Sequence, residues 1–233
     1  MDKDVAKQIV KTGGWLALVP AKAADQLLAN ALLIHLEPGS YLFRQGDPPG
    51  GLYAVVKGTL LMEVASRTDS YRLLGIQTPG GWFGQKPSLT GSPRTISYRS
   101  VGEVVLLNIP LPALRVFMDS VPDGGAMIAS ISEWYLDIAI DTLSDMTIPS
   151  AERRIAAMLL RLAKYPYGIS GEDGGLVELS QSQIAEVANA SRDNVNRAIA
   201  KFRRNGWLES GYKWLRLTRP EAIERFVAED EFS

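Results

Sequence analysis

The stretch LSQSQIAEVANASRDNVNRAIAKFRRNGWL, residues 179–208, decides the fold of the C-terminal part of this chain. Ser180 and Gln183 have the spacing of a capping box, in which the serine hydroxyl and the glutamine side chain each bond a backbone N–H at a helix start. A break follows at Asn189-Ala190, and Ser191 can cap a second helix. The stretch therefore predicts a short helix, a tight turn and a second helix.

Both predicted helices have an apolar face and a polar face. The second one ends at Gly206, a residue type typical of the position just after a helix. Its outward side carries five basic residues against the single acid Asp193, which suits a groove lined by phosphates. A solvated surface helix with no nucleic-acid partner would look similar. The apolar positions are Ile184, Ala185, Val187 and Ala188 in the first helix and Val195, Ile199 and Phe202 in the second, and the basic ones are Arg192, Arg197, Lys201, Arg203 and Arg204.

A β-hairpin is predicted directly after the second helix. Residues 207–208 and 213–217 have strand character, and the segment 209–212, which contains a glycine, supplies the turn. Two helices followed by such a hairpin form the pattern of a winged helix-turn-helix.

The composition limits the classes of protein to consider. With 233 residues, 46% hydrophobic and 22% charged, the chain can form one large core or two modest ones, and we expect two domains. The absence of cysteine excludes disulfides, zinc–thiolate sites and cysteine-ligated iron–sulfur clusters. No apolar run approaches a membrane span, and the charged N-terminus lacks a signal-peptide core, so we expect a cytoplasmic protein.

Residues 32–109 consist of short apolar segments separated by glycines, which predicts a β-sandwich or barrel. A small barrel could be a metalloenzyme of the cupin type, but that site needs several histidines and His35 is the only one in the chain. We interpret His35 as a packed or surface residue of an apolar strand. One histidine and no cysteine also provide no nucleophile–base pair, so an enzyme is not expected.

The segment 81–95, GWFGQKPSLTGSPRT, is the second informative stretch. A glycine corner at Gly84 and a short helical turn would present backbone N–H groups, and Arg94 adds a fork of donors that matches a phosphate. These residues describe an anion cradle. A surface loop with a solvated Arg94 explains the same residues equally well.

Together these motifs resemble the CRP/FNR family of bacterial transcription regulators, over about residues 36–217. The spacing Leu36-x-x-Gly39-x-x-Leu42-x-x-x-Gly46-Asp47 resembles the start of the family's cyclic-nucleotide-binding-type β-roll. The segment from Gly84 to Thr95 resembles its phosphate-binding cassette, and Ser191-Arg192-Asp193-x-Val195-x-Arg197 resembles its recognition helix. The resemblance implies an α+β chain made of an N-terminal jelly-roll-type β-roll, a long dimerisation helix and a C-terminal winged helix-turn-helix.

The resemblance also implies two sets of site residues. One set would bind the effector and the other DNA. In the DNA-binding set, Arg192 and Arg197 are placed to contact guanine and Asp193 to contact cytosine, although the family more often has a glutamate at that acidic position. The effector-binding residues are Gly84, Gln85, Ser88, Arg94 and Thr95, and the DNA-binding residues are Ser180, Gln181, Ser191, Arg192, Asp193, Asn196, Arg197 and Lys201.

A long helix is predicted over residues 122–146, between the β region and the helix pair. Its apolar stripe, with roughly heptad spacing, would pair with the same stripe of a second chain, as the resemblance implies, or pack on the β-roll of its own chain. Pro149 and Ser150 then interrupt the helix and form the predicted hinge, before a further helix over residues 151–164. The stripe consists of Met127, Ile131, Trp134 and Ile138, followed by Leu143 and Met146.

The chain departs from the family pattern at the positions that would contact the effector. Cyclic AMP binders carry a glutamate after the cassette glycine, where this chain has the neutral Gln85, and Pro87 lacks an N–H. The helix positions that supply adenine-contacting hydroxyls in the family correspond to the apolar Ala139 and Ile140. We therefore expect an anionic effector, which is a cyclic nucleotide or another phosphorylated small molecule, and we disfavour cyclic AMP.

The resulting hypothesis divides the chain into an effector domain (1–118), a dimerisation helix with hinge (119–148) and a DNA-binding domain (149–233). The protein would act as a homodimer on palindromic double-stranded DNA and contact RNA polymerase, with the effector shifting the balance between two states. The alternative is a family member with a degenerate pocket, which acts without an effector or under the control of a protein partner.

Overall fold

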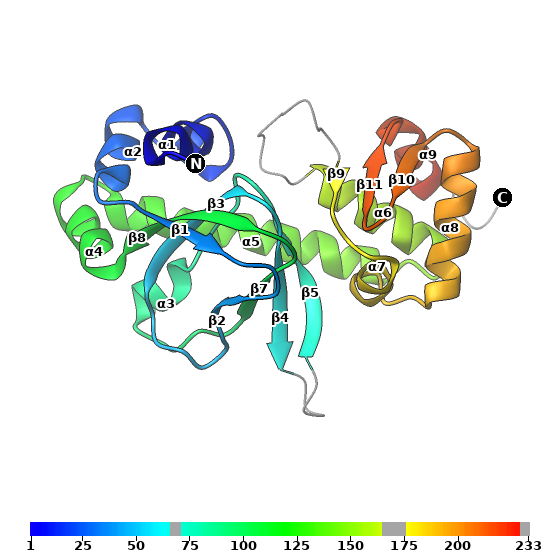
Figure 1. The fold of residues 1–233 in the computed structure, drawn as a ribbon, viewed down its shortest axis with the longest axis horizontal. Helices are drawn as coiled ribbons and strands as arrows, with labels where there is room; N and C mark the ends of the chain where they lie inside the picture. The colour runs from blue at the N-terminus through cyan, green and yellow to red at the C-terminus, as the bar shows by residue number, and fades with distance from the viewer. Residues whose placement is uncertain (66–70, 165–175, 229–233) are drawn as a thin grey trace. The chain divides into compact units, whose positions relative to one another are not determined.

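The computed structural model describes residues 1–65, 71–164 and 176–228 (Figure 1). The chain forms two compact units. The first comprises Met1–Asp137, here called the roll unit, and the second contains the described residues from Ile138 onward, here called the DNA unit. The boundary between the two units lies inside the long helix α5 (Gly124–Met146).

The roll unit is built from two four-stranded antiparallel sheets with helices at both ends of its sequence. One sheet has the strand order β1-β8-β3-β6 and the other β2-β7-β4-β5. Its strands are β1 (Leu32–Leu36), β2 (Tyr41–Phe43), β3 (Gly51–Lys57), β4 (Leu60–Ala65), β5 (Tyr71–Gln77), β6 (Trp82–Phe83), β7 (Ser97–Ser100) and β8 (Val104–Pro110), and its helices are α1 (Lys3–Lys11), η1 (Trp15–Leu18), α2 (Ala21–Leu28), α3 (Gln85–Thr90), α4 (Leu111–Ser120) and the first part of α5.

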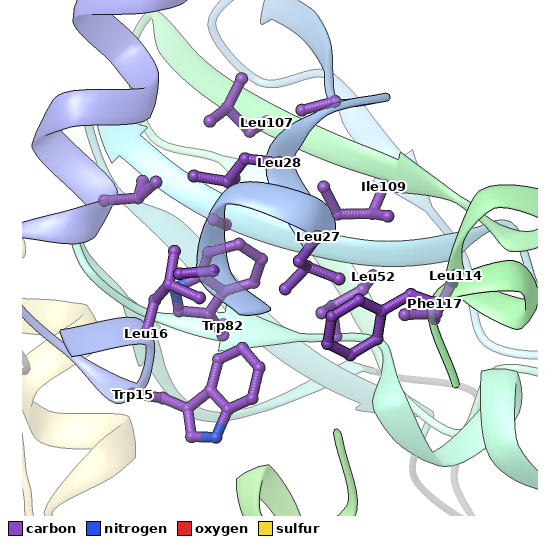
Figure 2. Packing of buried hydrophobic residues seen from close by; sticks show 14 of the residues in the cluster. Trp15, Leu16, Leu27, Leu28, Leu52, Trp82, Leu107, Ile109, Leu114 and Phe117 are labelled. Atoms are coloured by element: carbon purple, nitrogen blue, oxygen red, sulfur yellow. The ribbon is translucent and has the colours of Figure 1, made fainter. Parts of the chain in front are cut away.

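The N-terminal helices cover the sheet that contains β3 and β8, and together they form the larger core of the roll unit. Figure 2 shows Trp15 and Leu16 of η1 and Leu27 of α2 packed over the strands of this sheet. The rings of Trp15 and Trp82 meet edge to face, with their centroids 5.4 Å apart. Residues 1–31 fall within the predicted effector domain, but no sequence pattern indicated that side chains of this segment form part of its core.

A second core lies inside the roll and contains a cluster of aromatic rings. Phe83 is 1% exposed and stacks on Tyr98 with a centroid distance of 4.2 Å. The Tyr53 ring also stacks on the Phe83 ring, with a centroid distance of 5.6 Å. The Phe43 ring meets the Tyr98 ring edge to face, with a centroid distance of 5.3 Å. This cluster forms the floor beneath the predicted anion cradle.

Helix α5 confirms the long helix predicted over residues 122–146, and the first part of its apolar stripe packs on its own chain. Ile131 is 1% exposed and belongs to the larger core, and Met127 and Trp134 pack against that core. These three residues therefore pack against the roll of their own chain, and pairing of the stripe with a second chain stays a prediction. The heptad-like spacing did not distinguish the two, because a core-facing helix and a coiled-coil helix repeat their apolar residues at similar intervals.

The DNA unit consists of a helical core and a three-stranded antiparallel sheet of order β10-β11-β9. Phe202 of α8 is fully buried, and its ring lies 5.6 Å from both Trp207 and Phe226. The elements of this unit are the end of α5, α6 (Ala151–Lys164), β9 (Leu176–Val177), α7 (Gln181–Val187), α8 (Arg192–Arg204), β10 (Leu208–Gly211), β11 (Trp214–Leu217) and α9 (Pro220–Ala228).

The helix-turn-helix boundaries agree closely with the prediction. Ser180 and Gln183 form both bonds of the capping box, and Ser191 Oγ accepts from the Asn194 N–H at 3.1 Å. Gly206 follows α8 with a φ of +69°, the left-handed conformation for which glycine is favoured. The predicted positions of these helix ends are confirmed.

The hairpin exists, but its turn lies further along the chain than predicted. Strand β10 continues through Gly211, and the connection consists of Tyr212 and Lys213 instead of residues 209–212. Lys213 adopts the left-handed conformation that the glycine was expected to supply. Within the described ranges, every helix is too short or too polar to span a membrane.

Candidate effector cradle and DNA-reading helix

Arg94 occupies the centre of the predicted anion cradle and is buried, with 3% of its surface exposed. Its guanidinium carbon lies 4.0 Å from the ring centroid of Phe43 and 5.3 Å from that of Tyr53. One Nη2–H points at the Gly51 carbonyl oxygen at 3.4 Å. The alternative in which Arg94 is a solvated loop residue is therefore wrong.

The remaining donors of Arg94 lack acceptors. Its Nε and Nη1 atoms are buried, and no described residue accepts a hydrogen bond from either of them. Burial lowers the pKa of this guanidinium from its ordinary value, and the neighbouring Tyr53 and Tyr98 raise it in part. A buried cation with unsatisfied donors is costly, and a phosphate or carboxylate oxygen would satisfy it.

Gly84 makes the close approach to Arg94 possible. Its φ of +99° is a conformation that other residues rarely adopt, and a Cβ atom there would lie 2.9 Å from Arg94 Nη1 and 2.6 Å from the Gly51 carbonyl oxygen. Helix α3 starts immediately after Gly84, as the predicted short helical turn requires. The backbone at Gly51 and Gly84 thus lies directly against the guanidinium.

Helix α5 closes the other side of the cassette. Gln85 is buried, and its Nε2 atom approaches Ser132 Oγ at 3.4 Å. Tyr135 donates its hydroxyl proton to the Trp82 carbonyl oxygen at 2.7 Å. Residue 85 thus contacts the long helix through Ser132, whereas Ala139 and Ile140, the helix residues expected at the ligand, are exposed.

The other predicted effector residues are less central than Arg94. Ser88 is buried, but its hydroxyl donates to the Gly84 carbonyl oxygen at 2.8 Å within α3. Thr95 is exposed to solvent. The structure therefore places Gly84, Gln85 and Arg94 together and leaves Thr95 at the surface.

Sequence reasoning missed the residues that surround Arg94. Phe43, Tyr53 and Ser132 come from β2, β3 and α5, which lie far from the cassette in sequence. The motif itself gave no signal for them, because an aromatic residue in a strand and a serine in a helix are ordinary core and surface choices.

The DNA-reading face of α8 is open to solvent. Arg192, Asp193, Asn196 and Arg197 are all exposed, while Val195 on the opposite side is fully buried. The helix is thus oriented with its polar residues outward, as its pattern predicted. Arg197 bonds the Asn194 side chain, so its guanidinium is already directed along the helix surface.

The rest of the predicted DNA-binding set divides into two groups. Gln181 is exposed beside the capping Ser180, at the start of α7. Lys201 instead bonds Glu152 Oε2 at 3.0 Å and lies 4.6 Å from the Phe226 ring. Lys201 therefore links α8 to α6 and α9, and 39% of its side chain is still exposed, so its contact with DNA stays a prediction.

The predicted hinge is held by hydrogen bonds from α6. Ser150 Oγ accepts from the Arg153 N–H at 3.4 Å. Arg154 Nη1 donates to the carbonyl oxygens of Ile148 at 2.7 Å and Pro149 at 2.9 Å. Proline does interrupt the helix here, and the interruption is stabilised from within the DNA unit.

His35 lies exposed on β1, opposite Val105 of β8. Among the residues that the structure describes, no group of three or more histidine, cysteine or acidic side chains is placed to hold a metal ion. Beside the cassette, Arg94 carries two buried donor atoms, Nε and Nη1, that lack an acceptor within the described residues.

Two family models match this chain. The cyclic nucleotide-binding domain matches residues 33–121, and the Crp-like helix-turn-helix domain matches residues 153–226. The first range contains Arg94 and the second contains the whole of α7 and α8. The chain belongs to the CRP/FNR family. It is a DNA-binding transcription regulator and not an enzyme.

Similar proteins share the complete architecture. The CRP-like cAMP-activated global transcriptional regulator of Mycobacterium tuberculosis is 27% identical over 222 residues, which cover 94% of this chain and 98% of that protein. Among solved structures, FixK2 of Bradyrhizobium japonicum has a TM-score of 0.72 at 16% identity and covers 86% of this chain and 98% of that one. The c-di-GMP responsive global regulator CLP of Xanthomonas campestris has a TM-score of 0.62 at 22% identity, over 85% and 99% of the two chains.

Proposed function

We propose that this CRP/FNR-family regulator binds palindromic DNA as a homodimer and that a small anion bound at Arg94 controls its DNA affinity. The observation that carries the proposal is the buried guanidinium whose Nε and Nη1 donors meet no acceptor among the described residues. An anion that contacts these donors would remove the cost of the uncompensated charge and stabilise the state that holds it.

The residues around Arg94 favour a phosphorylated compound over a neutral one, and they do not favour cyclic AMP in particular. Gln85 is neutral and already contacts Ser132, so it offers no carboxylate to a ribose hydroxyl. The relatives differ in their effectors, since the Mycobacterium protein is named for cAMP and the Xanthomonas protein for c-di-GMP. The shared fold therefore does not specify the nucleotide.

Dimerisation is proposed through the exposed side of α5. Leu136, Ile140 and Leu143 are 53%, 55% and 68% exposed, and their spacing of four and three residues places them on one helical face. This face replaces the stripe that the sequence suggested, because Ile131 packs in the core of its own chain. Pairing two such helices would bury six large aliphatic side chains.

The reading residues support binding in a major groove. Arg192 and Arg197 carry guanidinium groups that can contact guanine in pairs of hydrogen bonds, and Asp193 can accept from cytosine. Ser180 and Gln181 would contact phosphate and fix the register. A two-fold dimer would place two copies of α8 about one DNA turn apart, on half-sites of a palindrome. In the cytoplasm, a regulator bound in this way would act through contact with RNA polymerase.

Thermal unfolding in the presence of candidate anions tests the effector proposal. Inorganic phosphate, cyclic AMP, cyclic GMP and c-di-GMP would each be added at about 100 times their dissociation constant or at saturation. A bound anion should raise the melting temperature by roughly 5–10 °C. The Arg94→Met variant should show no shift, whereas Arg44→Met, which removes an exposed arginine of the same roll, should behave as the wild type.

Two results would overturn the effector proposal. One is the absence of any shift for all four compounds, which would favour a regulator whose activity depends on its abundance or on a protein partner. The other is an equal shift in the wild type and in Arg94→Met, which would place the anion elsewhere.

A further inference from the structure

A single side chain, that of Arg154 in α6, connects the predicted hinge with the turn of the helix-turn-helix. Its Nη1 atom donates to the carbonyl oxygens of Ile148 and Pro149, as described above. Its Nη2 atom donates to the carbonyl oxygen of Asn189, at 3.3 Å. One guanidinium therefore bonds two segments that are about forty residues apart in the chain.

The turn that Arg154 contacts determines where the reading helix begins. Asn189 has a φ of +47°, a left-handed conformation that is uncommon for a residue other than glycine. The Ala190 N–H bonds the Ala185 carbonyl oxygen at 2.9 Å, and Ser191 then caps α8. A group that holds the Asn189 carbonyl therefore fixes the direction in which α8 leaves the turn.

The hinge end of this connection is joined to the long helix. The Ile148 N–H bonds the Asp145 carbonyl oxygen at 3.1 Å, so the chain still follows the last turn of α5. Arg161 of α6 also bonds the Asp145 carboxylate at 3.0 Å. The C-terminal end of α5 and the turn before α8 are thus both attached to α6, the first through Arg161 and the second through Arg154. Arg154 also bonds Ile148 and Pro149, which directly follow the end of α5.

We propose that Arg154 is a positioning residue that sets the orientation of α8 relative to the end of α5, and so fixes the spacing of the two DNA half-sites. The inference rests on the proposed homodimer, in which α5 of each chain carries one reading helix. Arg154 itself touches no base in this account. It acts by holding three backbone carbonyl oxygens in one arrangement.

The chemistry of arginine suits this task. Its planar guanidinium offers five N–H donors in a fixed fork, so it can bond carbonyl groups that approach from different directions. A lysine has the same charge but a single nitrogen on a flexible stem, and it would not hold the two segments at a fixed separation. Arg154→Lys therefore separates loss of geometry from loss of charge.

The test is a selection of DNA sites from a random double-stranded library, carried out with the full-length protein. Wild type, Arg154→Ala, Arg154→Lys and Arg153→Ala would be compared. Arg153 lies next to Arg154, and its guanidinium carbon is 6.0 Å from the centroid of the Phe226 ring. Within the part of the chain that the structure describes, its guanidinium bonds neither the hinge nor the turn, and its backbone N–H bond to Ser150 does not depend on the side chain. Thermal unfolding of each protein would identify a temperature at which all four are folded, and the selection would be carried out at that temperature.

The wild type and Arg153→Ala should select a palindrome with one half-site spacing. Arg154→Ala and Arg154→Lys should select the same half-site bases with a broadened distribution of spacings. For the lysine variant, the preference for the native spacing over a spacing changed by one base pair should fall on the order of tenfold, the effect of a single mismatch.

An unchanged spacing preference in folded Arg154→Ala and Arg154→Lys would overturn the proposal, even if affinity fell. That result would assign Arg154 to stability alone. Failure of the wild type to select any palindrome is a different outcome, because it would contradict the dimeric function itself.

Discussion

The reading helix and the anion cradle differ in how their polar groups are satisfied. At the helix pair, Ser180, Gln183 and Ser191 bond the free backbone N–H groups, and the reading side chains extend into solvent. At the cradle, Arg94 is 3% exposed and two of its donor atoms have no acceptor among the described residues. The backbone donors at the helix starts are thus satisfied without DNA, whereas two donors of the buried guanidinium are left without an acceptor.

This difference indicates how the two sites contribute to regulation. Exposed side chains on a capped helix cost little to maintain, so the DNA-reading surface can exist before DNA binds. A buried cation with two unsatisfied donors is costly to the unbound roll, and the proposed anion would lower the free energy of the state that holds it. A ligand can shift an equilibrium only through such a difference in affinity between two states.

The largest expected effect comes from the core beneath the reading helix. Phe202→Ala should destabilise the DNA unit by about 3–5 kcal/mol, because it removes a fully buried ring that contacts Trp207 and Phe226. Chemical denaturation followed by fluorescence would measure this. The anion-induced melting shift of the roll unit should remain, and its loss would mean that the two sites are not separable as described.

Arg94→Met should act in the opposite direction on the roll unit. Because the substitution replaces an unpaired buried charge with an apolar side chain, it should stabilise the unbound protein by about 1–4 kcal/mol. Denaturation of the ligand-free protein would show it, with Arg44→Met as the control. A destabilised Arg94→Met protein would indicate that the guanidinium is already satisfied.

The reading surface should respond to Arg192→Ala through binding and not through folding. Affinity for the selected operator should fall by about 1–3 kcal/mol with a relaxed base preference, while the unfolding transition stays in place. Fluorescence anisotropy measures this, and Arg219→Ala, an exposed arginine outside α8, serves as control. If both variants lost the same affinity, charge alone and not base reading would explain the binding.

The cap at the start of α7 should give the smallest effect. Ser180→Ala removes the acceptor of the Gln183 N–H and should lower the stability of the DNA unit by about 1 kcal/mol. Ser182→Ala, one position into the helix and exposed, should change stability by less. Equal losses of stability in the two variants would show that the cap at Ser180 does not stabilise the helix.

The same comparison explains which features the sequence could predict. The capping box, the Ser191 cap and the terminal Gly206 depend on contacts within five residues, so their spacing in the chain is sufficient to identify them. The cradle depends on contacts between β2, β3, α3 and α5. Its motif identified Arg94 and Gly84, but burial of the guanidinium against Phe43 could be decided only by the folded roll.

The features that the sequence left ambiguous have a common physical origin. Ile131 and Lys201 each lie at a position where one sequence pattern fits two environments. An apolar residue at helical spacing can face its own core or a second chain, and a lysine can face DNA or a glutamate of the adjacent helix. Glu152 and the N-terminal helices decided these cases, and neither is near the affected residue in sequence.

The most direct measurement of the central claim compares operator affinity with and without the anion that gives the largest melting shift. In the wild type, the anion should change the affinity by about 5- to 150-fold, the range of typical coupling between sites. In Arg94→Met the affinity should be the same with and without it. Equal operator affinity in the wild type under both conditions, with the anion demonstrably bound, would contradict the coupling of the roll to the reading helix.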